Sequence, residues 1–95
     1  MVINSSNAKE GAQSIWVGNS HSEPITLCIE PWADEIPIPS GSTFLLVFEG
    51  PEGHSLAVEW GVGRITVYGW SGCVANIFDD GKLLWSRLIP VPLMP

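Results

Sequence analysis

The residues of this chain that are able to do chemistry are few, and their spacing forms no familiar catalytic or metal-binding set. His21 and His54 lie in predicted loops, at neither the i, i+2 nor the i, i+4 spacing that brings two imidazoles to one metal ion. Cys28 and Cys73 have no adjacent histidine and no predicted helix N-terminus that would lower their pKa. We therefore expect no catalytic residue, no bound metal and no cofactor, and we expect the protein not to be an enzyme. The cysteines should be buried as small hydrophobic side chains.

The acidic residues come in pairs that fall in predicted turns, with Asp34 next to Glu35 and Asp79 next to Asp80. A glycosidase needs two carboxylates across a cleft, one of them with a raised pKa, and turn residues are ordinarily solvated. No D-x-D-x-D-G series for calcium is present. With a net charge of −6, the same four residues become candidate contacts for a basic partner, as in an inhibitor of a nuclease toxin.

Five tryptophans are the least ordinary feature of the composition. Trp60 falls on a predicted core face, whereas Trp32 and Trp70 fall at turns, where a partly exposed ring provides a stacking platform for a sugar or an anchor for a protein. Trp32, Trp70 and the two histidines are therefore the candidate ligand-binding residues of a small cupin-like barrel. The alternative is that these large rings only fill the core and close its ends.

Composition excludes several classes of partner. Only four residues are Lys or Arg, which is too few for the basic surface that nucleic acid or anionic lipid requires. No apolar run approaches the ~20 residues of a membrane-spanning helix, and residues 1–11 lack the pattern of a signal peptide. We therefore expect a cytoplasmic protein with reduced cysteines.

The stretch from Thr43 to Trp85 contains five short apolar or alternating runs separated by glycine-bearing turns, which predicts an antiparallel β meander. Further candidate strands cover residues 14–18, 24–30 and 33–38, and no window keeps a helical period free of Gly and Pro. The predicted fold is all-β, a single antiparallel sandwich or flattened barrel of seven to eight strands with little or no helix. Its expected core comprises Leu27, Ile29, Leu45, Val47, Leu56, Val58, Ile65, Val67 and Ile77.

The ends of the chain differ from this central domain. Residues 1–13 are polar and without period, which predicts a flexible arm unless Val2 and Ile3 pair onto a sheet edge. Residues 14–87 form the all-β domain. Residues 88–95 alternate apolar residues with proline, which predicts an extended, polyproline-like tail.

Several turn motifs resemble those of a group of short bacterial all-β proteins for which no activity is assigned. These motifs are E-P-W at Glu30 to Trp32, P-x-G at Pro39 to Gly41, G-P-E-G at Gly50 to Gly53, the glycine–tryptophan turn at Gly69-Trp70, and the final D-G hairpin at Asp80-Gly81. The resemblance implies a small all-β domain and carries over no catalytic residue.

Low charge and high apolar content lead to the preferred functional hypothesis. Charged residues make up 15% of the chain against 45% hydrophobic residues, so some apolar surface should be shared with a partner. We expect a non-enzymatic interaction module that self-associates, as a dimer in which tail residue Leu93 lies against the second subunit. The sugar-binding barrel and the acidic inhibitor are the alternatives.

Overall fold

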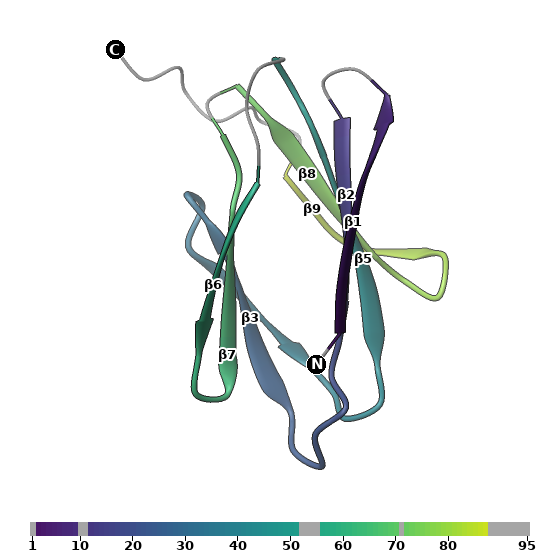
Figure 1. Ribbon diagram of the computed structural model, residues 1–95, viewed down its shortest axis with the longest axis vertical. Helices are drawn as coiled ribbons and strands as arrows, with labels where there is room; N and C mark the ends of the chain where they lie inside the picture. Colours follow the sequence, from purple (N-terminus) through teal and green to yellow (C-terminus); the bar gives the residue numbers. More distant parts are fainter. Residues whose placement is uncertain (1, 10–11, 52–55, 71, 88–95) are drawn as a thin grey trace.

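The structure is a computed structural model that describes residues 2–9, 12–51, 56–70 and 72–87. In this part of the chain every regular element is a β-strand (Figure 1). No helix long and apolar enough to cross a membrane occurs among these residues. The nine strands are β1 (Val2–Lys9), β2 (Ala12–Gly18), β3 (Ile25–Glu30), β4 (Asp34–Ile38), β5 (Thr43–Glu49), β6 (Ala57–Gly61), β7 (Arg64–Tyr68), β8 (Val74–Asp79) and β9 (Lys82–Arg87).

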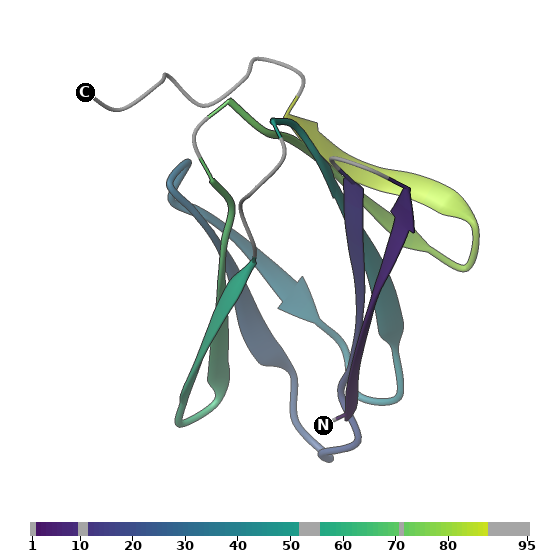
Figure 2. The ribbon, with the colours of Figure 1, turned by 45° about the horizontal axis from the view of Figure 1, so that its top comes forward.

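The strands form two facing sheets, as the two views in Figures 1 and 2 show. The larger sheet has the order β1-β2-β5-β8-β9, and the smaller has the order β4-β3-β7-β6. Within the described residues no hydrogen-bonded strand pair joins the two sheets. The protein is therefore a β-sandwich, which confirms the predicted all-β class and chooses the sandwich over the flattened barrel.

Alternation along each strand produces the core between the sheets. In β3, Ile25, Leu27 and Ile29 are buried while Thr26 and Glu30 are partly exposed, as the sequence pattern predicts. Five predicted core residues are fully buried, namely Leu27, Ile29, Ile65, Val67 and Ile77. Leu56 and Val58 pack against this cluster from its margin.

The expected core orientation of β5 is wrong. Phe44, Leu46 and Phe48 face the core, so Leu45 and Val47 lie on the outer face of the larger sheet and are only half-buried. The run is apolar on both sides, so alternation could not show which side faces inward. Strand β5 is nevertheless central, with β2 on one side and β8 on the other.

The predicted meander is also wrong in its connections. β6–β7 and β8–β9 are antiparallel hairpins, but β5 pairs with β8, so the chain crosses to the smaller sheet after β5 and returns after β7. The crossings bring Gly50 and Gly69 against Cys73: a Cβ built on Gly50 would lie 2.7 Å from the Cys73 Cα. β3 and β7 pair in parallel, which the predicted antiparallel arrangement did not include.

The N-terminal stretch forms strand β1 rather than a free arm. Val2 pairs with Gly18 and Ile3 with Val17, so the edge pairing considered for these two residues occurs and extends to Lys9 with one irregularity of register. The predicted polyproline-like tail at 88–95 lies outside the described residues. Including β1, the sandwich has one strand more than the upper limit of the prediction.

Candidate functional site

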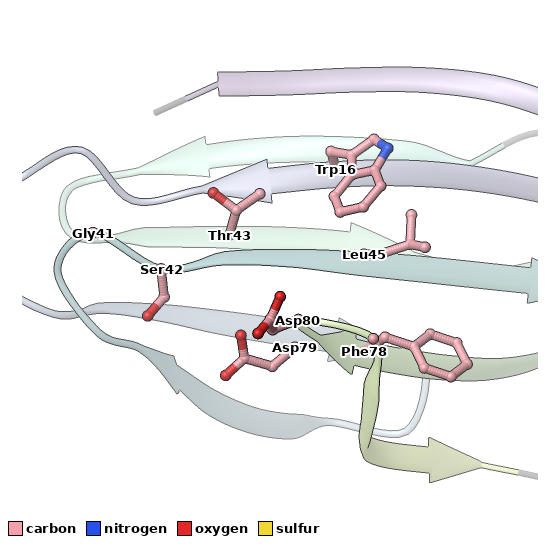
Figure 3. Close-up of a pocket in the computed structure, with 9 residues that line it drawn as sticks. Trp16, Gly41, Ser42, Thr43, Leu45, Phe78, Asp79 and Asp80 are labelled. Carbon is pink, nitrogen blue, oxygen red and sulfur yellow. The ribbon is translucent and has the colours of Figure 1, made fainter.

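A groove of about 660 Å³ lies on the outer face of the larger sheet, at the end where β5 begins and β8 ends (Figure 3). The register places Trp16 of β2 opposite Leu45 of β5, and Leu45 opposite Phe78 of β8, so the three side chains form one apolar row across the sheet. The Trp16 side chain is 48% exposed, although the neighbouring residues Ile15 and Val17 are buried on the other face. This row provides the apolar part of the groove.

Polar groups line the same end of the groove. Ser42 and Thr43 lead into β5, and Asp79 and Asp80 lie where β8 turns into β9. Among the described residues, none of these four side chains takes part in a hydrogen bond or ion pair. The hairpin is positioned by Asp80 (φ 51°) and Gly81 (φ 78°), whose positive φ angles fit the predicted D-G turn. The groove thus combines an indole, hydroxyl groups and carboxylates.

A second exposed apolar feature lies at the edge of the smaller sheet. Trp60 of β6 pairs with Ile65, and Val58 pairs with Val67, so both β6 side chains project from the core-facing side of the sheet. Val58 is partly buried, but Trp60 is 56% exposed. Trp60 therefore lies on the core-facing side of the sheet, as predicted, but its side chain is not buried. It lies at the edge strand, where the opposite sheet does not cover it.

The other side of the sandwich is closed by polar and aromatic contacts between β4 and β9. Arg87 donates two hydrogen bonds to the Asp34 carboxylate, Nε to Oδ2 at 2.8 Å and Nη2 to Oδ1 at 3.1 Å, and Trp85 Nε1 donates to Oδ2 at 3.1 Å. Trp32 packs edge-on against Trp85, with 6.0 Å between ring centroids. The hydrogen bonds from Arg87 hold the pKa of Asp34 below its usual value. Asp34 and Trp32 therefore join the two sheets.

Trp70 does not have the predicted exposed position. Its side chain is only 7% exposed and packs beside Phe48, with 6.3 Å between ring centroids. The turn from Trp70 to Cys73 folds back: the backbone N–H of Cys73 donates to the Trp70 carbonyl, and the Trp70 N–H donates to Cys73 Sγ. The indole Nε1 of Trp70 has no hydrogen-bond partner among the described residues. Trp70 is thus a core residue and not a stacking platform.

The remaining predicted site residues do not come together. Glu35 pairs with Arg64 across the outer face of the smaller sheet, whereas the Asp79-Asp80 turn belongs to the larger sheet. His21 is exposed in the loop before β3, where buried Asn19 organises the backbone by donating to the carbonyls of Glu23 and Ile38. His54 and Leu93 lie outside the described residues.

Both cysteines are free and buried, as predicted. Burial raises the pKa of Cys28, and the hydrogen bond from its Sγ to Glu30 raises it further. Burial likewise raises the pKa of Cys73. Both thiols are therefore protonated at neutral pH, which does not suit a nucleophile.

The described residues contain no group of three or more His, Cys, Asp or Glu side chains able to hold a metal ion.

On the outer face of the smaller sheet, Tyr68 donates to Glu59 at 3.2 Å, and this hydrogen bond raises the pKa of Tyr68. The two side chains are exposed and belong to neighbouring strands β6 and β7. They stabilise a hairpin surface.

Sequence reasoning missed the residues that form the groove. Trp16 is one of the five tryptophans, but neither Trp16 nor Phe78 is among the site residues that the sequence predicts. A signal was present, because Trp16 stands between Ile15 and Val17 and must therefore point away from them in a strand. The pairing of β5 with β2 on one side and β8 on the other puts Trp16, Leu45 and Phe78 in one row, and it cannot be read from one sequence.

Comparison with known proteins adds no family to this description. A scan against protein-family models and searches of curated proteins and of solved structures found no match.

Proposed function

We propose that this protein is a non-enzymatic interaction module that associates with a second copy of itself through the edge strand β6. The observation that carries the proposal is Trp60, which projects from the core-facing side of β6 and yet is 56% exposed. In the described part of the chain no strand pairs with the free edge of β6. A strand added there would cover Trp60 and Val58 while also completing the backbone hydrogen bonds of the edge.

The other three edges of the sandwich carry features that oppose strand addition. β4 contains Pro37, which has no N–H to donate. β9 has an irregular register between Ile77 and Phe78 of its partner strand, and β1 has one between Ser6 and Lys9. β6 pairs regularly with β7 over all five of its residues and contains no proline. It is the edge best suited to accept another strand.

A two-fold axis at β6 supplies such a strand from an identical chain. Antiparallel pairing of Ala57–Gly61 with its copy would set Trp60 of one protomer opposite Val58 of the other, twice, on the core-facing side. Glu59 would lie opposite its own copy on the outer face. Because two opposed carboxylates repel, this arrangement makes association weak at neutral pH and stronger when that charge is removed.

The test is the molar mass measured by light scattering over a dilution series. Wild type should form dimers whose fraction rises with concentration. Trp60→Lys should remain monomeric, because the substitution places a charged side chain opposite Val58 of the second copy in place of the apolar contact. Glu59→Gln should associate more strongly than wild type, which an interface elsewhere on the molecule would not produce.

Leu83→Lys is the matched control, since Leu83 is 59% exposed on a different edge strand, β9. It should dimerise as wild type does. A wild-type protein that stays monomeric at high micromolar concentration would overturn the proposal. Dimerisation that is lost in Leu83→Lys and kept in Trp60→Lys would move the interface to β9.

The acidic-inhibitor alternative loses two of its four expected contacts, because Asp34 and Glu35 are already paired with Arg87 and Arg64. Asp79 and Asp80 line the groove on the larger sheet instead. The contribution of Leu93 to the dimer stays a prediction, which deletion of residues 88–95 tests. A cytoplasmic location also remains part of the proposal, supported by two buried cysteines that are not joined in a disulfide.

A further inference from the structure

We infer that the groove on the outer face of the larger sheet is a binding site for a neutral pyranose sugar, with the Trp16 indole as its stacking platform. The site lies on the opposite sheet from β6, so the inference does not rest on the proposed self-association. It replaces Trp32 and Trp70, the residues expected from the sequence, with Trp16 and the groups around it.

The shape of the groove fits a small ligand. Its volume of about 660 Å³ falls within the usual range of ligand pockets, roughly 300–1,000 Å³. Leu45 and Phe78 continue the apolar row beyond Trp16, whose side chain is 48% exposed. A half-exposed indole in such a place offers a flat apolar face with little ordering cost on binding, because the β2–β5 pairing already fixes its strand.

The polar groups specify the chemistry of the ligand. Figure 3 shows the Asp79 and Asp80 carboxylates and the Ser42 hydroxyl at the end of the groove, to one side of Trp16 and Leu45. Carboxylates accept hydrogen bonds, so they need a ligand with several hydroxyl donors. A pyranose provides these around its rim while its C–H faces are apolar. The described residues make no hydrogen bond to the side chains of Asp79, Asp80, Ser42 or the neighbouring Thr43, so these groups are available to a ligand.

Charge excludes the main competitors. Among the residues that the structure describes, two carboxylates and no Lys or Arg line the groove, and the whole chain has a net charge of −6. Phosphorylated sugars, nucleotides and acidic sugars would therefore be repelled. A nucleobase also stacks on indole but presents few donors to two carboxylates, and a quaternary amine favours a cage of several rings rather than one exposed indole.

The experiment is a titration of uniformly ¹⁵N-labelled protein with methyl β-glucopyranoside and cellobiose, following the five indole N–H signals. Trp16→Phe assigns the Trp16 signal. We expect that signal to shift saturably, with a dissociation constant in the millimolar range, while the Trp60 signal does not move. Trp16→Ala has no Trp16 indole signal, so the backbone amide signals of the groove residues Thr43, Leu45 and Asp79 report binding in this variant. It should bind about tenfold or more weakly, which corresponds to about 1.4 kcal/mol.

Asp80→Asn tests the polar side of the groove with the turn preserved, because asparagine also accepts the positive φ at this position. We expect it to weaken sugar binding several-fold. Trp60→Ala, which removes a similarly exposed indole from the other sheet, should bind as wild type does. Thermal melts of each variant separate loss of the site from loss of the fold, and Trp16→Phe retains a ring should Trp16→Ala not fold.

Absence of any saturable Trp16 shift with either sugar would overturn the inference. So would unchanged binding by Trp16→Ala, or tighter binding of choline or adenosine than of the sugars. Light scattering on Trp16→Ala keeps the two proposals apart, since loss of sugar binding with unchanged molar mass concerns the groove alone.

Discussion

Arg87 of β9 donates two hydrogen bonds to Asp34 of β4, with Nε 2.8 Å from Oδ2 and Nη2 3.1 Å from Oδ1. The two strands belong to different sheets, so this pair joins the two layers of the sandwich along one side. Trp85 adds a third hydrogen bond to the same carboxylate. Such a bidentate pair is stronger than a single contact between exposed charges.

Asp34→Asn should destabilise the protein at neutral pH, because it removes the charge that Arg87 and Trp85 bond. The Arg87 and Asp34 side chains remain 42% and 25% exposed, so solvent screening limits the expected loss to about 1 kcal/mol. The pKa of Asp34 is lowered below its ordinary 3.8. Its contribution is thus complete well above pH 3.8 and is lost as the pH falls through the lower, folded-state pKa.

Urea unfolding of wild type and Asp34→Asn, at neutral pH and at a pH below 3.8, measures this dependence. The difference in free energy of unfolding should shrink on acidification. Glu35→Gln is the control, because the Glu35–Arg64 pair is exposed on both sides and should contribute little. Equal losses in the two variants at neutral pH would show that the bidentate contact has no special role.

Gly50→Ala should destabilise the sandwich by about 1–3 kcal/mol through overpacking. A Cβ at this position would lie 2.7 Å from the Cys73 Cα, which is backbone and cannot move aside without shifting β8. Gly69→Ala should behave similarly, since its Cβ would lie 2.7 Å from Cys73 Sγ and 3.4 Å from Phe48.

Gly61→Ala provides the matched comparison for these two variants. Its nearest contacts would be at 3.8 Å, an ordinary van der Waals distance. Chemical denaturation should therefore rank Gly61→Ala close to wild type and both other variants well below it. A Gly50→Ala protein as stable as Gly61→Ala would contradict the close approach of the two crossing segments to Cys73.

Trp70→Phe should retain most of the stability of the wild type, within about 1.5 kcal/mol, because it keeps a ring beside Phe48. It also removes a buried indole N–H that has no partner among the described residues, and an unpaired buried donor is itself unfavourable. Trp70→Ala should cost about 3–5 kcal/mol because it leaves a large cavity. Differential scanning calorimetry of both variants checks this. If Trp70→Phe lost as much stability as Trp70→Ala, the Trp70 Nε1–H would have a hydrogen-bond acceptor in the folded protein.

Local pattern was enough to predict most of the strands. Alternation identified β3, with Ile25, Leu27 and Ile29 inward, and turn residues located the Asp80-Gly81 hairpin. These features depend on neighbours within a few positions, which one sequence displays in full. The all-β class follows from the same signals.

The candidate site could not be predicted in the same way, because it depends on contacts between distant segments. The pairing of β5 with β8, rather than β6, brings Phe78 beside Leu45 and creates the groove. Glycines at the crossings gave no sign of this, since the same residues also suit a meander. Trp70 illustrates the reverse error: its turn looked exposed, but the segment folds back over Phe48 and buries the ring.

The two leucines in the middle of β5 test this assignment of faces directly. Leu46 is fully buried between the sheets, whereas Leu45 is half-buried on the outer face, and they are adjacent in sequence and identical in chemistry. Leu46→Ala should cost about 2–5 kcal/mol, because it leaves a cavity in the core. Leu45→Ala should cost no more than about 1 kcal/mol, since water can fill the space on the open face. Urea unfolding of the two variants gives both values under identical conditions. If Leu45→Ala proved the more damaging, β5 would be turned by one residue, and the apolar row with Trp16 and Phe78 would face the core instead of the groove.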